Sequence, residues 1–227
     1  MKKFFVTAFI STLAYLPQGT VQAQECTFYF PFKQGAELEM KSFTDKDKVT
    51  SISRSKVLEV SGNTVKFQSE VFDEKEKPLM KSDYTVSCKN GEFVMDMGNY
   101  LKGVNMDTYK DMEIKVETKD MHMPANLKAG DVLDDGQMTM KVSNQGFPIM
   151  TMMVKVYNRK VALVEKITTP AGTFECAKIT YDVDSKTVFS ISAKGVEWVA
   201  KNVGVVRSES YSSKGKLTGY TLLTSLK

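Results

Sequence analysis

The sequence is poor in the residues that many enzymes and metal sites depend on. Its 227 residues include one histidine, three cysteines and one tryptophan, and the formal net charge is only +4. With a single histidine, no site can be built from two imidazoles, and imidazole-dependent nucleophilic catalysis has only His122 to use. The remaining composition, 42% hydrophobic and 26% charged, is that of an ordinary globular protein.

Long hydrophobic runs are missing except at the N-terminus. Two lysines at positions 2 and 3 precede an apolar run over residues 4–16, and the small-residue pattern Val-Gln-Ala follows at 21–23. Because about 13 apolar residues are too few for the roughly 20 that span a bilayer, this order predicts a secretory signal peptide, residues 1–23, cleaved after Ala23. We expect residues 24–227 to be exported to the periplasm, the cell surface or the medium, with no transmembrane span.

Charge of one sign is not in excess either. Loss of residues 1–23 removes two lysines and no acid, which leaves 204 residues with a net charge of +2. Nucleic-acid-binding proteins usually carry a strongly basic surface. The sequence therefore does not predict nucleic acid as a partner.

Three cysteines in an oxidising compartment allow one disulfide and one free thiol. Cys26 lies near the mature N-terminus and Cys88 ends a strand-like run, so a bridge between them would hold the terminus; the other two pairings stay open. Glu25 fits poorly before a lipidated cysteine, which favours a soluble protein over a lipoprotein. Cys176 lies in an apolar pattern and is interpreted as a small buried hydrophobic residue.

Apolar residues recur at every second position through most of the mature chain, for example over residues 65–71, 138–142, 150–156 and 179–183. Such alternation gives each strand one buried and one solvated face, which is typical of antiparallel sheets. We predict an all-β fold with a minor α component, a large curved antiparallel sheet or a partial or closed β-barrel, in a single domain. Five segments are predicted as hairpin turns: residues 61–63, 89–91, 134–136, 144–146 and 213–215.

Residues 98–128 follow the β pattern least well. Residues 98–111 are predicted as a loop with one helical turn, in which Leu101, Val104 and Tyr109 share a side, because Gly103 weakens a longer helix. A loop of this length in a β domain is either a lid or binding loop or a packed connection.

Methionine is the one residue type that is unusually abundant. The sequence has 14, and several of them occur in pairs separated by one residue. Positions i and i+2 of a strand project from the same face, so each pair presents two thioethers together. One interpretation is an adaptable apolar core or a cavity for a lipid-like ligand. Under it, the candidate ligand-binding residues are Met138, Met140, Met150 and Met152.

The other interpretation of the methionines is Cu(I) binding, because thioethers are soft ligands. Met121, His122 and Met123 would supply two sulfurs and an imidazole. In a regular strand, however, the imidazole would point away from both sulfurs. We therefore favour the core or cavity interpretation and keep this metal site as the alternative.

Motifs for catalysis are missing. The sequence has no nucleophile elbow, metalloprotease helix, dinucleotide fingerprint or paired Cys-x-x-Cys motif. Acidic pairs such as Asp134 with Asp135 and Asp182 with Asp184 lie where solvated charge is the usual role. We assign no catalytic residue and no cofactor.

Two C-terminal segments resemble a motif pair found in a family of exported bacterial β-rich proteins of unknown function. They are residues 168–179 (TTPAGTFECAKI), with a Pro-Ala-Gly-Thr-Phe turn before a strand, and residues 197–209 (EWVAKNVGVVRSE), with a tryptophan strand and a Val-Gly-Val-Val step. Residues 30–35 and 84–88 are similar to the same group. The resemblance implies a curved sheet or partial barrel of the kind used by envelope carriers of lipids or lipoproteins, and it supplies no catalytic residues.

Our leading hypothesis is a non-enzymatic exported β protein whose concave, methionine-rich face binds an apolar small molecule or an envelope protein. The alternatives are a periplasmic Cu(I)-handling protein and an uncharacterised envelope enzyme.

Overall fold

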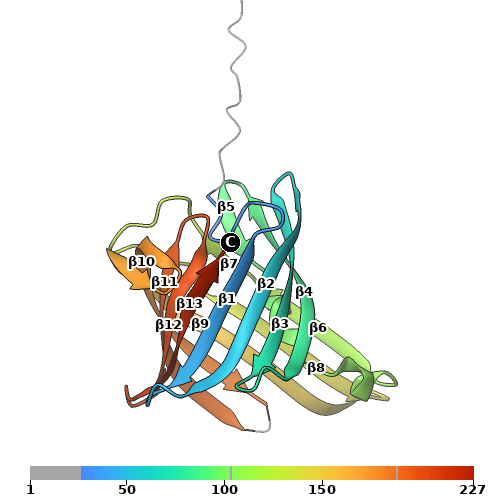
Figure 1. Ribbon diagram of the computed structural model, residues 1–227. Helices are drawn as coiled ribbons and strands as arrows, with labels where there is room; N and C mark the ends of the chain where they lie inside the picture. Colours follow the sequence, from blue (N-terminus) through green and yellow to red (C-terminus); the bar gives the residue numbers. More distant parts are fainter. Residues whose placement is uncertain (1–26, 103, 188) are drawn as a thin grey trace, which may run out of the picture.

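The chain folds into one antiparallel sheet of thirteen strands that is nearly closed as a barrel (Figure 1). The computed structural model describes residues 27–102, 104–187 and 189–227. Strands make up 68% of the structure and helices 5%, in a single domain, so the predicted all-β class and barrel-like sheet are confirmed. The helical component within these residues is of the 3-10 type.

The strands have the following bounds: β1 (Glu37–Thr44), β2 (Val49–Ser61), β3 (Thr64–Asp73), β4 (Pro78–Lys89), β5 (Glu92–Met95), β6 (Glu113–Lys119), β7 (Met121–Met123), β8 (Gly136–Asn144), β9 (Phe147–Thr169), β10 (Gly172–Lys186), β11 (Ser190–Ala200), β12 (Gly204–Ser212) and β13 (Leu217–Leu226). Two 3-10 helices, η1 (Met97–Leu101) and η2 (Met106–Tyr109), connect β5 to β6.

Two runs of consecutive strands build most of the barrel. Strands β1–β5 form one run and β8–β13 the other, and β1 joins them by pairing with β13, where Leu38 lies opposite Leu226. On the other side, β6 pairs with β8 and β7 pairs with β5, and only Asp120 separates β6 from β7. One continuous segment, residues 113–123, thus links the two edges of the sheet and brings the barrel close to closure.

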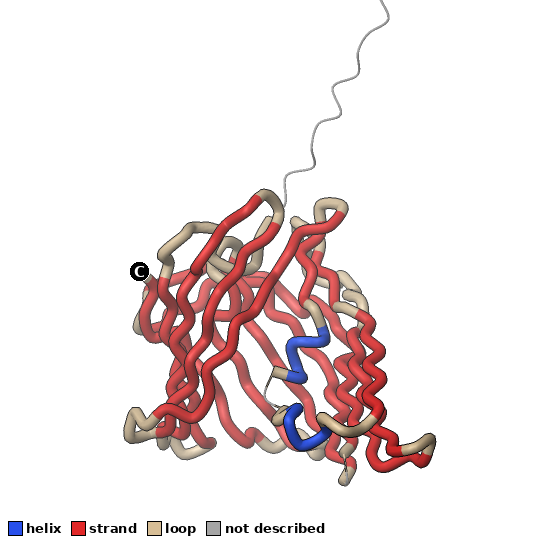
Figure 2. The backbone as a smooth tube through the Cα atoms, turned by 90° about the vertical axis from the view of Figure 1, so that its right-hand side faces the viewer, coloured by secondary structure: helices blue, strands red, loops and turns tan. Residues whose placement is uncertain are grey.

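Both 3-10 helices lie on the side of the barrel where the two sheet edges meet (Figure 2). Asp96 caps η1 by accepting a hydrogen bond from the Gly98 amide at 2.7 Å, and Asp120 accepts one from the Met97 amide at 3.0 Å. The second bond attaches η1 to the junction between β6 and β7. The predicted loop with one helical turn is therefore two short 3-10 turns; Gly103 lies outside the described residues.

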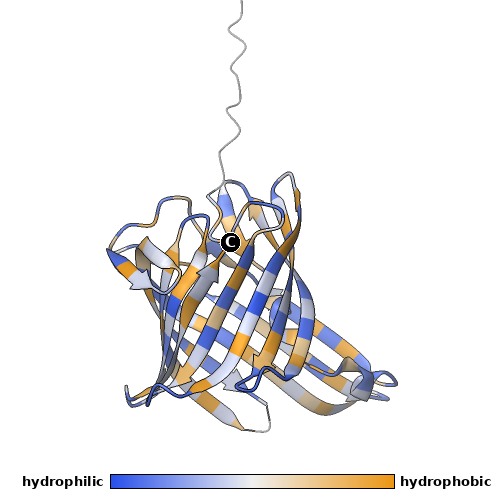
Figure 3. Ribbon diagram, viewed as in Figure 1, coloured by the Kyte–Doolittle hydropathy of each residue, from blue (hydrophilic) through white to orange (hydrophobic). Residues whose placement is uncertain are grey.

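Hydrophobic and hydrophilic side chains alternate along the strands, as the banding in Figure 3 shows. In β8, Met138, Met140 and Val142 are completely buried, whereas Lys141 is exposed. This is the period of two expected for a sheet with one solvated face.

Four of the five predicted hairpin turns are confirmed, with positive φ angles at Gly62, Asn90, Gly91, Gln145, Gly146 and Gly215. The prediction for residues 134–136 is wrong. Gly136 is the first residue of β8, and a Cβ atom there would lie 2.8 Å from Sδ of Met97 and closer still to Met121. This glycine serves close packing between strand and helix rather than a turn.

The residues before β1 fill one end of the barrel together with residues 124–133. Phe28 and Tyr29 are buried, and both rings pack edge-on against Phe93, with centroids about 6 Å apart. The Tyr29 hydroxyl donates to the Pro124 carbonyl at 3.0 Å. A core cluster that also contains Val65, Leu133 and other strand residues surrounds these rings, so this end is closed by packed side chains.

Candidate functional site: an apolar cavity inside the barrel

An apolar cavity of about 390 Å³ lies next to this packed end. Its volume is within the range of roughly 300–1,000 Å³ that small-molecule sites occupy. Strands from both halves of the sheet, η1 and the N-terminal segment contribute to its wall, so no single stretch of sequence encodes it. The apolar lining residues are Tyr29, Phe30, Leu38, Met40, Phe67, Val86, Phe93, Met95, Met97, Met121, Met123, Val199, Val203 and Val205.

Methionine is the most frequent residue type in this wall, with Met40, Met95, Met97, Met121 and Met123. The pairing of β5 with β7 sets Met95 opposite Met121. Unbranched thioether side chains change conformation at low cost and adapt to irregular partners. The wall can therefore fit apolar molecules of more than one shape.

The four methionines predicted to bind a ligand lie elsewhere. Met138 and Met140 are fully buried in a core cluster that includes Met97 and Met121, and Met150 and Met152 are partly buried against it. None of the four is among the residues that line the cavity. They pack behind the wall and support Met97 and Met121, which face the cavity.

In the alternative metal set, the side chains point to opposite faces of β7. Met121 and Met123 are buried, whereas His122 is half-exposed, with Nδ1 3.1 Å from Oε2 of Glu92. The imidazole therefore does not share a site with the two sulfurs. Within the residues that the structure describes, no three His, Cys, Asp or Glu side chains are arranged to hold a metal ion.

Cys176 is a free, buried cysteine, as expected from its apolar surroundings. Burial raises the pKa of its thiol to about 11, and the nearby carboxylates of Glu165 and Glu175 add to the shift. Cys26 and the predicted signal peptide, residues 1–23, lie outside the described residues. The bridge between Cys26 and Cys88 therefore stays a prediction.

Besides Ser55, Asp96 and Asn99, the cavity wall includes two polar side chains, Glu197 and Tyr100, that interact with buried polar groups behind it. Glu197 of β11 lines the cavity, and its Oε1 accepts a hydrogen bond from the Tyr181 hydroxyl at 2.8 Å. Burial raises the pKa of the Glu197 carboxyl, against the opposing effects of the Tyr181 hydrogen bond and the positive charge of Arg159. Tyr100 of η1, which is partly exposed, lines the same cavity, and partial removal from solvent raises the pKa of its hydroxyl, with the charge of Glu197 acting in the same direction.

Arg159 of β9 lies behind these groups and is only 4% exposed. Its Nη1 donates to the backbone carbonyl oxygens of Asp134 at 2.6 Å and His122 at 3.5 Å. Burial lowers the pKa of the guanidinium, and the charge of Glu197 partly offsets this effect. Since arginine stays protonated under almost all conditions, the cavity has a fixed positive charge behind one side.

Gly195 explains how Tyr181 reaches Glu197. The two strands pair so that Tyr181 lies directly opposite Gly195. A Cβ atom at Gly195 would lie 2.6 Å from the Tyr181 hydroxyl oxygen and closer still to the ring carbons. The ring therefore lies over the glycine, and its hydroxyl extends to the carboxylate two residues further along β11.

Sequence reasoning did not identify Glu197, Tyr181, Tyr100 or Arg159. One signal in the sequence could have indicated Glu197. Gly195, Glu197 and Val199 occupy alternate positions of β11 and therefore share one face, and an acid among small and apolar residues on an inward face is unusual. No such signal marks Tyr100, which reaches the cavity from a 3-10 helix.

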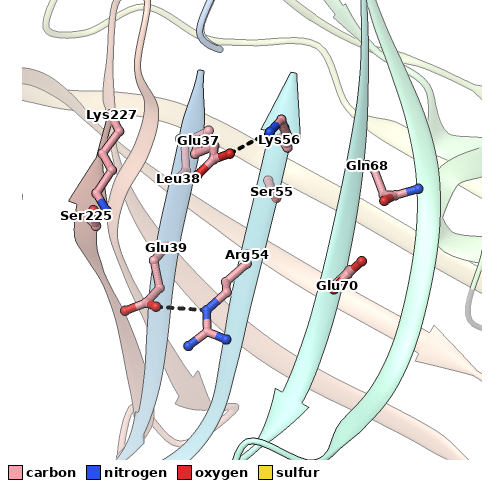
Figure 4. Close-up of a pocket in the computed structure, with 10 residues that line it drawn as sticks. All are labelled: Glu37, Leu38, Glu39, Arg54, Ser55, Lys56, Gln68, Glu70, Ser225 and Lys227. Atoms are coloured by element: carbon pink, nitrogen blue, oxygen red, sulfur yellow. Dashed lines mark hydrogen bonds and ion pairs between the residues drawn. The ribbon is translucent and has the colours of Figure 1, made fainter. Parts of the chain in front are cut away.

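A second concavity, of about 310 Å³, lies on the exposed face of β1–β3 and β13 (Figure 4). Four of its charged side chains form two ion pairs: Lys56 Nζ lies 2.8 Å from Glu37, and Arg54 Nε lies 3.0 Å from Glu39. Exposed pairs of this kind are common on solvated sheets and contribute little to stability. The interior cavity is therefore the better candidate site.

The fold and the cavity define a class of barrel-like antiparallel proteins with an apolar cavity that is partly open to solvent. Within that class, the chain belongs to the DUF3108-like family, whose model matches residues 33–223. No curated protein matches the sequence. None of the helices in the described residues is both long and apolar enough to cross a membrane.

Two solved structures are similar to this chain over nearly the whole fold. One, from Bacteroides fragilis, is assigned as an exported protein with a YmcC-like fold; it is 27% identical, has a TM-score of 0.71 and aligns over 89% of this chain and 100% of its own. The other, from Parabacteroides distasonis, is assigned as a lipoprotein. It is 27% identical, has a TM-score of 0.72 and aligns over 90% of this chain and 100% of its own. The resemblance to exported β-rich bacterial proteins is thus supported at the level of family and fold.

Proposed function

We propose that this protein is an exported, non-enzymatic binding protein that holds an apolar, lipid-like molecule inside its barrel. The observation that carries the proposal is the cavity of about 390 Å³ with its largely apolar wall. Protein interiors are close-packed, and voids larger than a water molecule are few. A partly open space of this size with a mainly apolar wall is a feature that small-molecule sites share.

The wall suits binding through the removal of apolar surface from water, which is worth about 25 cal/mol per Å². Flexible methionines such as Met95 and Met123 allow the wall to close around an elongated chain. Export is supported by the N-terminal sequence pattern and by what the two related structures are assigned to be. A protein of this kind would bind lipid-like molecules in the cell envelope and shield them from water.

The test uses residues 24–227 and the uncharged probe N-phenyl-1-naphthylamine, which fluoresces on entering an apolar site. We expect saturable binding by the unmodified protein. Val205→Trp should reduce the affinity at least about tenfold, because the larger side chain occupies cavity volume. Val116→Trp is the matched control, since Val116 is 42% exposed on β6 and does not line the cavity.

Two results would contradict the proposal. One is the lack of saturable probe binding by protein whose circular dichroism shows a folded sheet. The other is an equal loss of affinity in Val205→Trp and Val116→Trp, which would place the probe on the outer surface. Mass spectrometry of gently purified protein provides independent support if a lipid is retained.

A further inference from the structure

Four polar side chains from four different elements meet beside the apolar cavity: Tyr100 of η1, Arg159 of β9, Tyr181 of β10 and Glu197 of β11. They are close enough to influence one another electrostatically, and the Tyr181–Glu197 hydrogen bond connects two of them directly. Buried polar groups are costly unless they have partners, so such a cluster at an apolar wall requires an explanation.

Two atoms of this cluster are open to the cavity. Oε1 of Glu197 is occupied by Tyr181, whereas Oε2 makes no hydrogen bond with the described residues. No buried side-chain nitrogen or oxygen in the described part of the chain lacks a partner, so Oε2 keeps accessible surface, and Glu197 lines the cavity. The Tyr100 hydroxyl also makes no hydrogen bond there, and Tyr100 is 46% exposed and lines the same cavity.

The charge balance of the cluster selects the kind of polar group that fits. Arg159 is positive and forms no ion pair with a carboxylate among the described residues; its bonds go to backbone carbonyls. If Glu197 is ionised, the cluster has no net charge, and if Glu197 is protonated, the cluster is positive. Asp96 also lines the cavity, but it is exposed and its Oδ1 accepts a hydrogen bond from the Gly98 amide. Arg159 is the charged neighbour that acts on both Glu197 and Tyr100, so an anionic group placed between these two residues gains from its field in a medium of low dielectric constant.

We infer that the cavity binds a long-chain carboxylic acid, with the apolar chain against the methionine-rich wall and the carboxylate between Glu197 and Tyr100. This inference rests on the proposed function and adds the class of head group. Glu197 in its protonated form donates one hydrogen bond to the ligand carboxylate, and the Tyr100 hydroxyl donates a second. Arg159 acts through its field, because it lies behind the wall and does not line the cavity.

The experiment measures how well four molecules with the same sixteen-carbon chain displace N-phenyl-1-naphthylamine: hexadecanoic acid, hexadecanol, methyl hexadecanoate and hexadecylamine, each below its critical micelle concentration. We expect hexadecanoic acid to bind at least about tenfold tighter than the other three, as two charge-assisted hydrogen bonds would provide. Hexadecylamine should bind most weakly.

Variants locate the head group. Tyr100→Phe removes one hydroxyl and should lower the affinity for hexadecanoic acid by about three- to tenfold, which is the effect of one hydrogen bond. The affinity for the probe should not change. Tyr109→Phe is the matched control, because its hydroxyl contacts Sδ of Met150 outside the cavity wall. Glu197→Gln should keep the preference for the acid, since its amide still donates, whereas Glu197→Leu should remove it.

The outcomes separate the two proposals. Probe binding combined with equal affinities for the four molecules, or with the amine bound tightest, overturns the head-group inference and leaves the proposed function intact. Equal effects of Tyr100→Phe and Tyr109→Phe also overturn it. If the probe does not bind at all, the proposed function fails, and the inference fails with it. Because Tyr100→Phe changes a single accessible atom, the result does not depend on whether the Glu197 variants fold.

Discussion

Replacing Gly195 with alanine should displace the Tyr181 ring and break its hydrogen bond to Glu197. The new Cβ atom would lie 2.6 Å from the Tyr181 hydroxyl oxygen, whereas carbon–oxygen contacts are normally near 3.5 Å. The ring must therefore move by roughly 1 Å, which is enough to lengthen the 2.8 Å hydrogen bond beyond the usual limit.

The expected cost combines two effects. Overpacking a buried strand position costs about 1–3 kcal/mol, and loss of one hydrogen bond costs about 0.5–1.5 kcal/mol. We therefore expect Gly195→Ala to lower the free energy of unfolding by about 2–4 kcal/mol. Urea denaturation followed by fluorescence measures this value, because the only tryptophan, Trp198, is buried three residues along the same strand.

A double-mutant cycle tests the cause. In a Tyr181→Ala background the ring is gone, so Gly195→Ala should cost less than about 1 kcal/mol. If the two substitutions are additive to within about 0.5 kcal/mol, the clash with Tyr181 is not the reason for the loss, and the reasoning is refuted. Tyr181→Phe separates the hydroxyl from the ring, since it removes only the bond to Glu197.

The remaining predictions concern a core residue, a thiol and an ion pair. Met138→Ala should lower the free energy of unfolding by about 2–5 kcal/mol in urea titrations, because the side chain is fully buried; a loss below about 1 kcal/mol would contradict this. Alkylation followed by mass spectrometry should show Cys176 reacting slowly at neutral pH in folded protein and quickly in urea, since burial raises its pKa to about 11; equal rates would contradict the assignment. Hydrogen bonds from Asn158 and Lys194 lower the pKa of Asp182, so its carboxylate stabilises the fold above the unfolded pKa of about 3.9 and loses this effect as the pH falls through the lower, folded value. Wild type and Asp182→Asn should therefore differ most in unfolding free energy near pH 7 and converge in acid, and a difference that does not change with pH would count against this.

The fold could be predicted largely from local patterns. Alternation at Met138, Met140 and Val142 indicates which face of β8 is buried, and Asn90 with Gly91 indicates a hairpin because both adopt positive φ. The failure at Gly136 has a physical reason. A glycine that makes room for a neighbouring side chain and a glycine that forms a turn look the same in a single sequence, and only the packed neighbours distinguish them.

The site could be predicted only in part, since it depends on how distant strands meet. Methionine pairs correctly indicate thioethers grouped on one face, as Met121 and Met123 show. Which pair faces the cavity and which packs in the core depends on the pairing of β7 with β5. Tyr100 and Glu197 are almost a hundred positions apart in the chain, and no local motif connects them.

The pairing of the first strand with the last has a consequence for how the protein forms. Glu37 and Lys227 exchange two backbone hydrogen bonds, of 2.9 and 3.0 Å, so β1 receives its second neighbour only from the end of the chain. While the chain is emerging, β1 presents an open edge of the kind that recruits other strands. This edge stays open until β13 has been synthesised, so removal of β13 should produce aggregation rather than a smaller stable barrel.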